Sequence, residues 1–215
     1  MIHLLHIFAA RDTLKPAKPH ITAVNPEAEH EIERAISYLV RNFEETGHNP
    51  KPVIFHSLRV GIRLWDLGYG SLITIAGILH DVLEDTEVTE EALAAEFGDE
   101  VYRLVAANSH DRSIEGREGW YKEVFQRCYE AGREALIVKA ADFYDNLDYY
   151  GMGWRRQFTV HELRKAKYFI ELSAGRIGDE RVHADLKAKY DMLLDTKFSD
   201  LRLVLDEERA LRIVA

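Results

Sequence analysis

The sequence has 215 residues, 47% of them hydrophobic and 30% charged, which is enough apolar material for a soluble domain with a buried core. Its formal net charge is −9, with 37 acidic against 28 basic residues, and this balance argues against a nucleic-acid partner, whose binding surface would be basic. The single cysteine, Cys128, excludes a disulfide within the chain and fits a reducing cytoplasm, and no apolar run reaches the roughly 20 residues that span a membrane.

The first 24 residues are predicted to be irregular, because Pro16 and Pro19 interrupt any long regular element. The segment lacks a basic start and a small-residue cleavage site, so we do not interpret it as a signal peptide. We expect it to pack against the domain that follows or against a second subunit, which leaves a homo-oligomer open.

Helical periodicity begins at Asn25, a candidate N-cap that is followed by a proline at the first helical position. Apolar residues then recur at steps of three and four up to Gly47. The same pattern predicts further helices at 53–67, 71–86, 89–98, 99–108, 118–131, 133–148, 159–175 and 179–209. Ser71 and Thr89 are candidate N-caps, and no strand pattern appears, so we predict an all-α fold of about eight or nine helices.

One predicted helix contains the stretch "GILHDVLEDT", in which His80, Asp81, Glu84 and Asp85 interrupt an apolar run. At about 100° per residue these four side chains share one side of the helix, opposite the leucine, isoleucine and valine side chains. A solvated acidic face is the simplest interpretation. The adjacent His-Asp pair fits that interpretation poorly, because both side chains are good ligands for a divalent cation.

Two distant residues strengthen the metal interpretation. His56 lies in "IFHSLRV", and Asp142 lies in "LIVKAADFYDNL" after a strongly apolar run. Each alone is more often a core or surface residue than a ligand. A buried carboxylate needs a partner, however, and the order His, His-Asp, Asp predicts a shared site for one divalent ion.

This order is similar to that of the HD phosphohydrolases, an all-α, metal-dependent superfamily. "HDVLEDTEVTEEALAAEFGDEVYRLV" resembles the core of hydrolase domains of the RelA/SpoT type, and "KAADFYDNL" resembles their "KLADxxxN" segment. "HELRKAKYF" resembles a late segment of the single-domain alarmone hydrolases. The resemblance covers about residues 27–175. With the helix pattern, it predicts an irregular segment at 1–24, an HD hydrolase domain at 25–176 and a C-terminal helix at 177–215 that packs on this domain. We expect a stand-alone hydrolase without a synthetase domain.

The resemblance also implies roles for individual residues. The implied metal ligands are His56, His80, Asp81 and Asp142, and the implied ion is Mn²⁺, although Fe²⁺, Co²⁺ and Zn²⁺ suit two imidazoles and two carboxylates about equally. Glu84 and Asp85 would orient a water molecule or take its proton. The implied reaction removes pyrophosphate from the 3′ position of guanosine tetra- or pentaphosphate (ppGpp).

Six further residues are candidates for contact with the substrate: Asn146, Arg164, Tyr168, Lys139, Arg59 and Arg63. For Lys139 a structural ion pair is an equal alternative. The two arginines at 59 and 63 either grip a phosphate or pair with acidic residues. Because few basic residues precede His56, an HD-type nucleotidase or pyrophosphatase acting on other nucleotides stays open. A nucleotide-binding module without activity is a third alternative, against which the complete ligand set and the Glu84-Asp85 pair argue.

Overall fold

The fold was analysed in a computed structural model that describes residues 25–44, 52–110, 117–152, 156–202 and 204–205. Over these residues the chain forms ten α-helices and one 3-10 helix and contains no strand, so the all-α prediction is confirmed. The predictions for 1–24 and for the last residues of the C-terminal helix lie outside the described residues. None of the described helices combines the length and apolar character that a membrane crossing requires.

The helices have the following bounds: α1 Pro26–Glu44, α2 Val53–Asp66, α3 Gly70–Leu79, α4 Val82–Asp85, α5 Glu90–Phe97, α6 Asp99–Asn108, α7 Arg117–Ala131, α8 Arg133–Asn146, α9 Arg156–Ile177, α10 Arg181–Asp195 and the 3-10 helix η1 Ser199–Leu201.

Two of the predicted N-caps are confirmed. Asn25 Oδ1 accepts a hydrogen bond from the backbone N–H of Ala28 at 3.3 Å, and Thr89 Oγ1 accepts one from Ala92 at 3.2 Å. Each bond satisfies a backbone donor that the first helical turn leaves without an internal partner. At the end of α5, Gly98 has a φ of 84°, a conformation that glycine adopts without steric cost.

Three sequence predictions about helix boundaries were wrong. α3 begins at Gly70 rather than at a Ser71 cap. The helix predicted for 71–86 is split, because α3 ends before a turn at His80 and Asp81 and α4 starts a new hydrogen-bonded turn in which the backbone N–H of Asp85 donates to the carbonyl of Asp81 at 2.9 Å. The helix predicted for 179–209 ends at Asp195, and η1 follows it.

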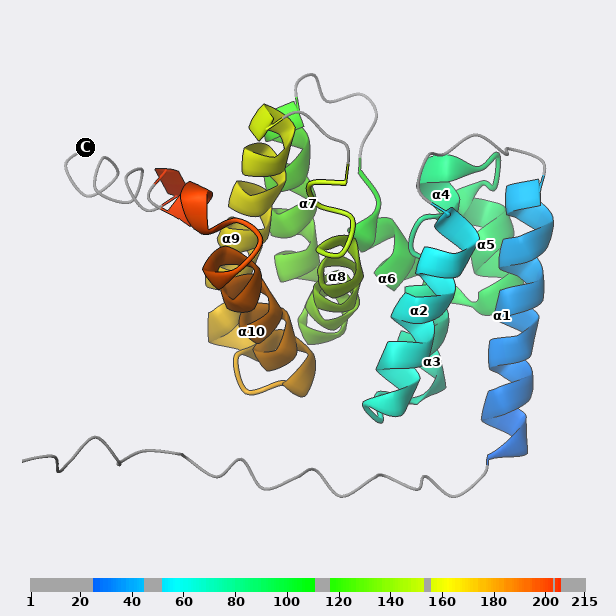
Figure 1. Cartoon of the computed structure of the whole chain (residues 1–215). Helices are drawn as coiled ribbons and strands as arrows, with labels where there is room; N and C mark the ends of the chain where they lie inside the picture. The colour runs from blue at the N-terminus through cyan, green and yellow to red at the C-terminus, as the bar shows by residue number, and fades with distance from the viewer. Residues whose placement is uncertain (1–24, 45–51, 111–116, 153–155, 203, 206–215) are drawn as a thin grey trace, which may run out of the picture.

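Figure 1 shows two groups of helices, α1 to α5 on one side and α7 to α10 on the other. α8 joins them, because it packs against α2, α3 and α6 as well as against α7, α9 and α10. Every residue of α8 from 135 to 143 is buried. Polar side chains on this helix therefore lie in the interior, where they require partners.

Two glycines allow α2 and α3 to approach closely. A Cβ on Gly61 would lie 2.2 Å from Cγ1 of Ile78, and a Cβ on Gly77 would lie 2.4 Å from Cδ1 of Leu64. Both distances are far shorter than a van der Waals contact, so a side chain at either position would push the helices apart. The close packing brings together the two helices that carry the candidate histidine ligands.

Candidate metal centre

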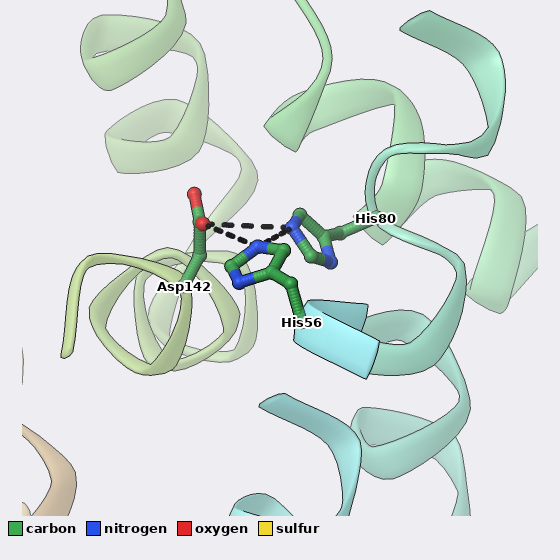
Figure 2. Close-up of side chains that lie close together, drawn as sticks. All are labelled: His56, His80 and Asp142. Carbon is green, nitrogen blue, oxygen red and sulfur yellow. Dashed lines mark hydrogen bonds and ion pairs between the residues drawn. The ribbon is translucent and has the colours of Figure 1, made fainter. Parts of the chain in front are cut away.

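Three polar side chains from different helices converge in the interior. His56 comes from α2, His80 from the turn that ends α3, and Asp142 from α8, and Figure 2 shows them pointing toward one another. The Nε2 atoms of the two histidines lie 3.2 Å apart. Asp142 Oδ1 lies 3.2 Å from Nε2 of His56 and 3.5 Å from that of His80. One donor atom from each residue lies within 4.8 Å of the others, as shared coordination of one ion requires.

Asp81 lies at the edge of this group. Its Oδ1 is 3.1 Å from His80 Nε2, and its Oδ2 is 3.7 Å from His56 Nε2. The four predicted ligands therefore lie around one region, with both imidazoles fully buried. Two facing imidazole nitrogens flanked by carboxylates need a proton or a cation between them, and this donor set suits a divalent transition metal. The residues present therefore fit a metal ion.

The electrostatics of the group show how strongly it favours positive charge. Burial by itself lowers the pKa of His80, but the carboxylates of Asp81 and Asp142 outweigh burial and raise that pKa to about 10. Burial by itself raises the pKa of Asp142, but Lys139 and His80 hold that pKa well below its usual range. A metal ion entering the group would have to displace a proton from His80.

Hydrogen bonds fix the orientation of both imidazoles. His80 Nδ1 lies 2.7 Å from the carbonyl oxygen of Gly77, and His56 Nδ1 lies 2.6 Å from Asp145 Oδ2. Each partner accepts the Nδ1 hydrogen, so Nε2 of each ring is the nitrogen that faces the shared region and would bind an ion. Sequence analysis missed Asp145. Its signal was a second aspartate three residues after Asp142 on the same helix.

Arg59 binds Asp145 and holds its carboxylate in place. Its Nε donates to Asp145 Oδ1 at 2.5 Å, and its Nη2 donates to Oδ2 at 2.7 Å and to the Tyr149 hydroxyl at 2.5 Å. Burial raises the pKa of Asp145, but the hydrogen bonds from Arg59 and His56 outweigh it and lower the pKa to about 2. Asp145 is therefore ionised at neutral pH and accepts the hydrogen of His56 Nδ1.

Arg63 is also committed to the fold. Its Nη2 donates to Asp185 Oδ2 at 2.7 Å, and its guanidinium carbon lies 3.5 Å from the centre of the Tyr144 ring. Neither Arg59 nor Arg63 lines the cavity described below. Of the two alternatives for these arginines, the structure favours pairing with acidic residues over contact with a phosphate.

A cavity of about 420 Å³ opens beside the converging side chains. Six residues predicted from the sequence line it: Asp81, Glu84, Asp85, Lys139, Asp142 and Asn146. Its other lining residues were not predicted, and they include Asn108, His110, the aromatic residues Tyr121, Phe125, Phe143 and Phe158, and the α9 residues His161, Glu162 and Lys165. The metal group therefore borders a space of the size that small ligands occupy.

Lys139 and Asn146 both bind the Asp142 carboxylate. Lys139 Nζ lies 3.2 Å from Asp142 Oδ2 and donates to the carbonyl oxygen of Asn108 at 3.0 Å. Asn146 Nδ2 donates to Asp142 Oδ1 at 2.5 Å. Burial lowers the pKa of Lys139, but the nearby Asp142 carboxylate outweighs it, so the pKa is raised and the lysine remains a cation at the cavity wall.

Two predicted substrate contacts on α9 do not line the cavity. Other residues of α9 line the cavity, and Arg164 and Tyr168 are not among them. The Tyr168 ring stacks on Phe125, with centroids 6.1 Å apart, so it packs behind the cavity wall. The rotation of a helix about its axis is set by packing that the local sequence does not specify, and the substrate contacts proposed for these two residues stay predictions.

Comparisons with known proteins place this geometry in a family context. The HD domain family matches residues 35–149, a range that contains all four predicted ligands. A probable guanosine-3′,5′-bis(diphosphate) 3′-pyrophosphohydrolase of Mycoplasma pneumoniae is 31% identical over 189 residues, which make up 80% of this chain and 25% of that protein. The guanosine-3′,5′-bis(diphosphate) 3′-pyrophosphohydrolase of Drosophila melanogaster is 29% identical over 102 residues, which make up 46% of this chain and 53% of that protein.

The chain thus spans about a quarter of the first relative and about half of the second. A solved structure described as a metazoan ortholog of SpoT that hydrolyses ppGpp superposes with a TM-score of 0.67 at 23% identity, over 81% of this chain and 98% of that one. At that identity the superposition supports the fold alone.

Proposed function

The chain belongs to the HD domain family, and on that premise we propose that it is a metal-dependent phosphohydrolase. We propose that it removes pyrophosphate from the 3′ position of guanosine tetra- or pentaphosphate or of a related nucleotide. The observation that carries the proposal is the convergence of His56, His80 and Asp142, with donor atoms mutually within 4.8 Å, at the wall of a cavity. The names of the similar proteins support the choice of substrate.

The proposed metal ligands are His56, His80, Asp81 and Asp142. Mn²⁺ is the ion that the family resemblance favours, while the donor set alone also suits Fe²⁺, Co²⁺ and Zn²⁺. When bound, a divalent ion supplies Lewis acidity, which polarises a phosphoryl oxygen and makes a nearby water molecule more acidic. Gly77 and Asp145 would keep the two imidazoles oriented before the ion arrives.

The remaining polar groups on the near wall have proposed roles of their own. Asp85 would orient the attacking water and accept its proton, because it lines the cavity one turn beyond Asp81. Asn146 would hold the Asp142 carboxylate in position. Lys139 would contribute a positive charge next to the substrate phosphates while remaining paired with Asp142.

The far wall of the cavity suits a nucleoside. It carries the partly exposed rings of Tyr121 and Phe158, which offer apolar surface for a base. Lys165, whose ammonium lies 5.7 Å from the centre of the Phe143 ring, would contribute a cation for phosphate. The substrate would then extend from the metal centre to α9.

A second candidate function follows from the charges that line the cavity. The described residues that line the cavity include several carboxylates, at Glu162 and near the metal centre, but only two lysines. Each of these lysines is already paired with a carboxylate. A less highly charged nucleotide would meet less repulsion. This favours, as the alternative, an HD-type nucleotidase or pyrophosphatase acting on another nucleotide.

A panel of nucleotides assayed with Mn²⁺ separates these functions. Release of pyrophosphate from guanosine tetraphosphate supports the leading proposal, and release of phosphate or pyrophosphate only from other nucleotides supports the alternative. Tight binding without turnover of any nucleotide would indicate a binding module instead. We further infer a cytoplasmic location, as suggested by the single buried cysteine. Size measurement of the purified protein tests whether it forms a homo-oligomer.

A further inference from the structure

A histidine that is not among the proposed metal ligands is held at the cavity wall by one of the two acidic residues of α4. The Oε1 atom of Glu84 accepts the backbone N–H of His110 at 2.7 Å, and Oε2 lies 2.8 Å from His110 Nδ1. Both residues line the cavity, and their side chains are 21% and 29% exposed. Glu84 therefore binds both the main chain and the ring of His110.

This contact determines which ring nitrogen carries the hydrogen toward Glu84. An ionised carboxylate only accepts hydrogen bonds, so Nδ1 must donate to it. The other nitrogen, Nε2, is then the position at which the ring of His110 exchanges a proton, and the carboxylate stabilises the ring when both nitrogens carry hydrogens. A carboxylate that fixes an imidazole in this way is a common device for proton transfer in enzymes.

The two acidic residues of α4 are therefore assigned different roles. Both carboxylate oxygens of Glu84 contact N–H donors of His110, so Glu84 is assigned to holding that residue. Asp85 lines the same cavity and stays assigned to the attacking water. Two neighbouring residues of α4 thus serve opposite sides of the proposed reaction, because Glu84 holds the proposed acid, His110, and Asp85 is the proposed base.

We propose that His110 is the catalytic acid that protonates the leaving oxygen, and that Glu84 is the residue that positions it. The proposal rests on the proposed function, in which water attacks the phosphorus attached to O3′. The water oxygen forms a bond to that phosphorus, and the P–O3′ bond breaks with its electron pair moving to O3′. His110 Nε2 gives its proton to O3′, Asp85 accepts the proton that the water loses, and the products are the nucleoside 3′-hydroxyl and pyrophosphate.

An acid is required at this point because a ribose alkoxide is a poor leaving group. A positioned general acid typically contributes on the order of 10²- to 10⁴-fold to a rate. We expect H110Q to lose at least about 100-fold in kcat with little change in KM. The Mn²⁺ affinity of the variant should be unchanged, because His110 is not a proposed ligand.

The variant H110N distinguishes proton transfer from positioning. An asparagine amide can donate to Glu84 as the Nδ1–H does, but it cannot carry a proton to the substrate. We expect H110N to be as slow as H110Q. Recovery of wild-type kcat in H110N would show that His110 only holds Glu84, and a loss of Mn²⁺ affinity would show that it acts through the metal centre. Either result overturns the proposal.

A substrate with sulfur in place of O3′ gives the decisive comparison, because a thiolate leaves without prior protonation. The deficit of H110N should shrink from about 100-fold to less than about 10-fold on this analogue, and an equal deficit on both substrates would refute the acid role. H30N is the matched control, because His30 forms a similar pair with Glu33 at 3.4 Å on the exposed surface of α1 and should change nothing.

The outcome for wild-type protein separates the two proposals. If wild type releases pyrophosphate and both His110 variants retain full kcat, the acid role is wrong and the proposed function stands. If wild type turns over no nucleotide on the panel, the proposed function fails and the role of His110 fails with it. Thermal melts of each variant should match wild type, which excludes unfolding as the cause of lost activity.

Discussion

The metal centre and the α9 wall of the cavity differ in how their polar groups are held. At the centre, His56, His80 and Asp142 are buried, and Nδ1 of each imidazole is held by another group of the protein, Asp145 or the carbonyl of Gly77. At the other wall, Lys165 is 31% exposed, and its carboxylate partner Glu162 lies only three residues away at 3.3 Å. The comparison suggests that the groups proposed for chemistry are oriented in advance, whereas those proposed for recognition are able to rearrange around a ligand.

The largest effect should come from the shared carboxylate of the metal centre. We expect D142N to reduce turnover by roughly a thousandfold or more, because it removes a proposed ligand and leaves a weaker, uncharged donor. Steady-state assays with Mn²⁺ in excess measure this change. If D142N kept a tenth of wild-type activity, Asp142 would not be an essential part of the catalytic metal centre.

Asp145 tests whether preorganisation matters at the centre. D145N should weaken Mn²⁺ binding by about 10- to 100-fold, because His56 loses the carboxylate that fixes its ring. D185N is the matched control. It also removes the carboxylate of an arginine–aspartate ion pair, that of Arg63 with Asp185, but this pair lies away from the metal centre. Equal affinities of the two variants in calorimetric titrations would contradict the role given to Asp145.

Lys165 tests the more adaptable wall. K165Q should raise KM by about tenfold with kcat nearly unchanged, since it removes a phosphate contact at a distance from the reacting atoms. K187Q is the control, because Lys187 forms a similar exposed ion pair with Asp191 and does not line the cavity. A fall in kcat without a rise in KM would show that Lys165 acts in the chemical step. It would contradict the distinction between a catalytic metal centre and a substrate-binding wall at α9.

The smallest expected effect is a dependence of stability on pH. The pKa of Asp145 is lowered to about 2, so its carboxylate stabilises the fold above its unfolded value of about 4. That contribution is lost as the pH falls from about 4 through 2. The difference in melting temperature between wild type and D145N should therefore be constant above pH 5 and should narrow below pH 4. A constant difference down to pH 2 would argue against the ion pair with Arg59.

Prediction from sequence succeeded where the signal is local. The helix periodicity and the Asn25 and Thr89 caps depend on neighbouring residues, and the structure confirms them. The order His, His-Asp, Asp was also readable, and the structure brings His56 and His80 together with Asp142. The roles given to these residues as metal ligands remain predictions.

Prediction failed where the answer depends on packing between distant segments. The pairing of His56 with Asp145 joins positions 89 residues apart. Arg164 and Tyr168 were chosen from a motif, and their roles stay predictions, but the α9 residues that line the cavity were not identified from the sequence. The contact between Glu84 and His110 likewise requires α4 to pack next to the end of α6, and no local sequence pattern predicts that packing.

The most direct test of the account is a titration of Mn²⁺ into metal-free wild type and D142N, followed by metal analysis of the wild-type protein after dialysis. We predict one ion per wild-type chain, release of protons as His80 gives up its hydrogen, and binding weakened at least a hundredfold in D142N. Absence of binding to wild type, or equal binding by both proteins, would contradict the claim that these buried side chains share a metal ion.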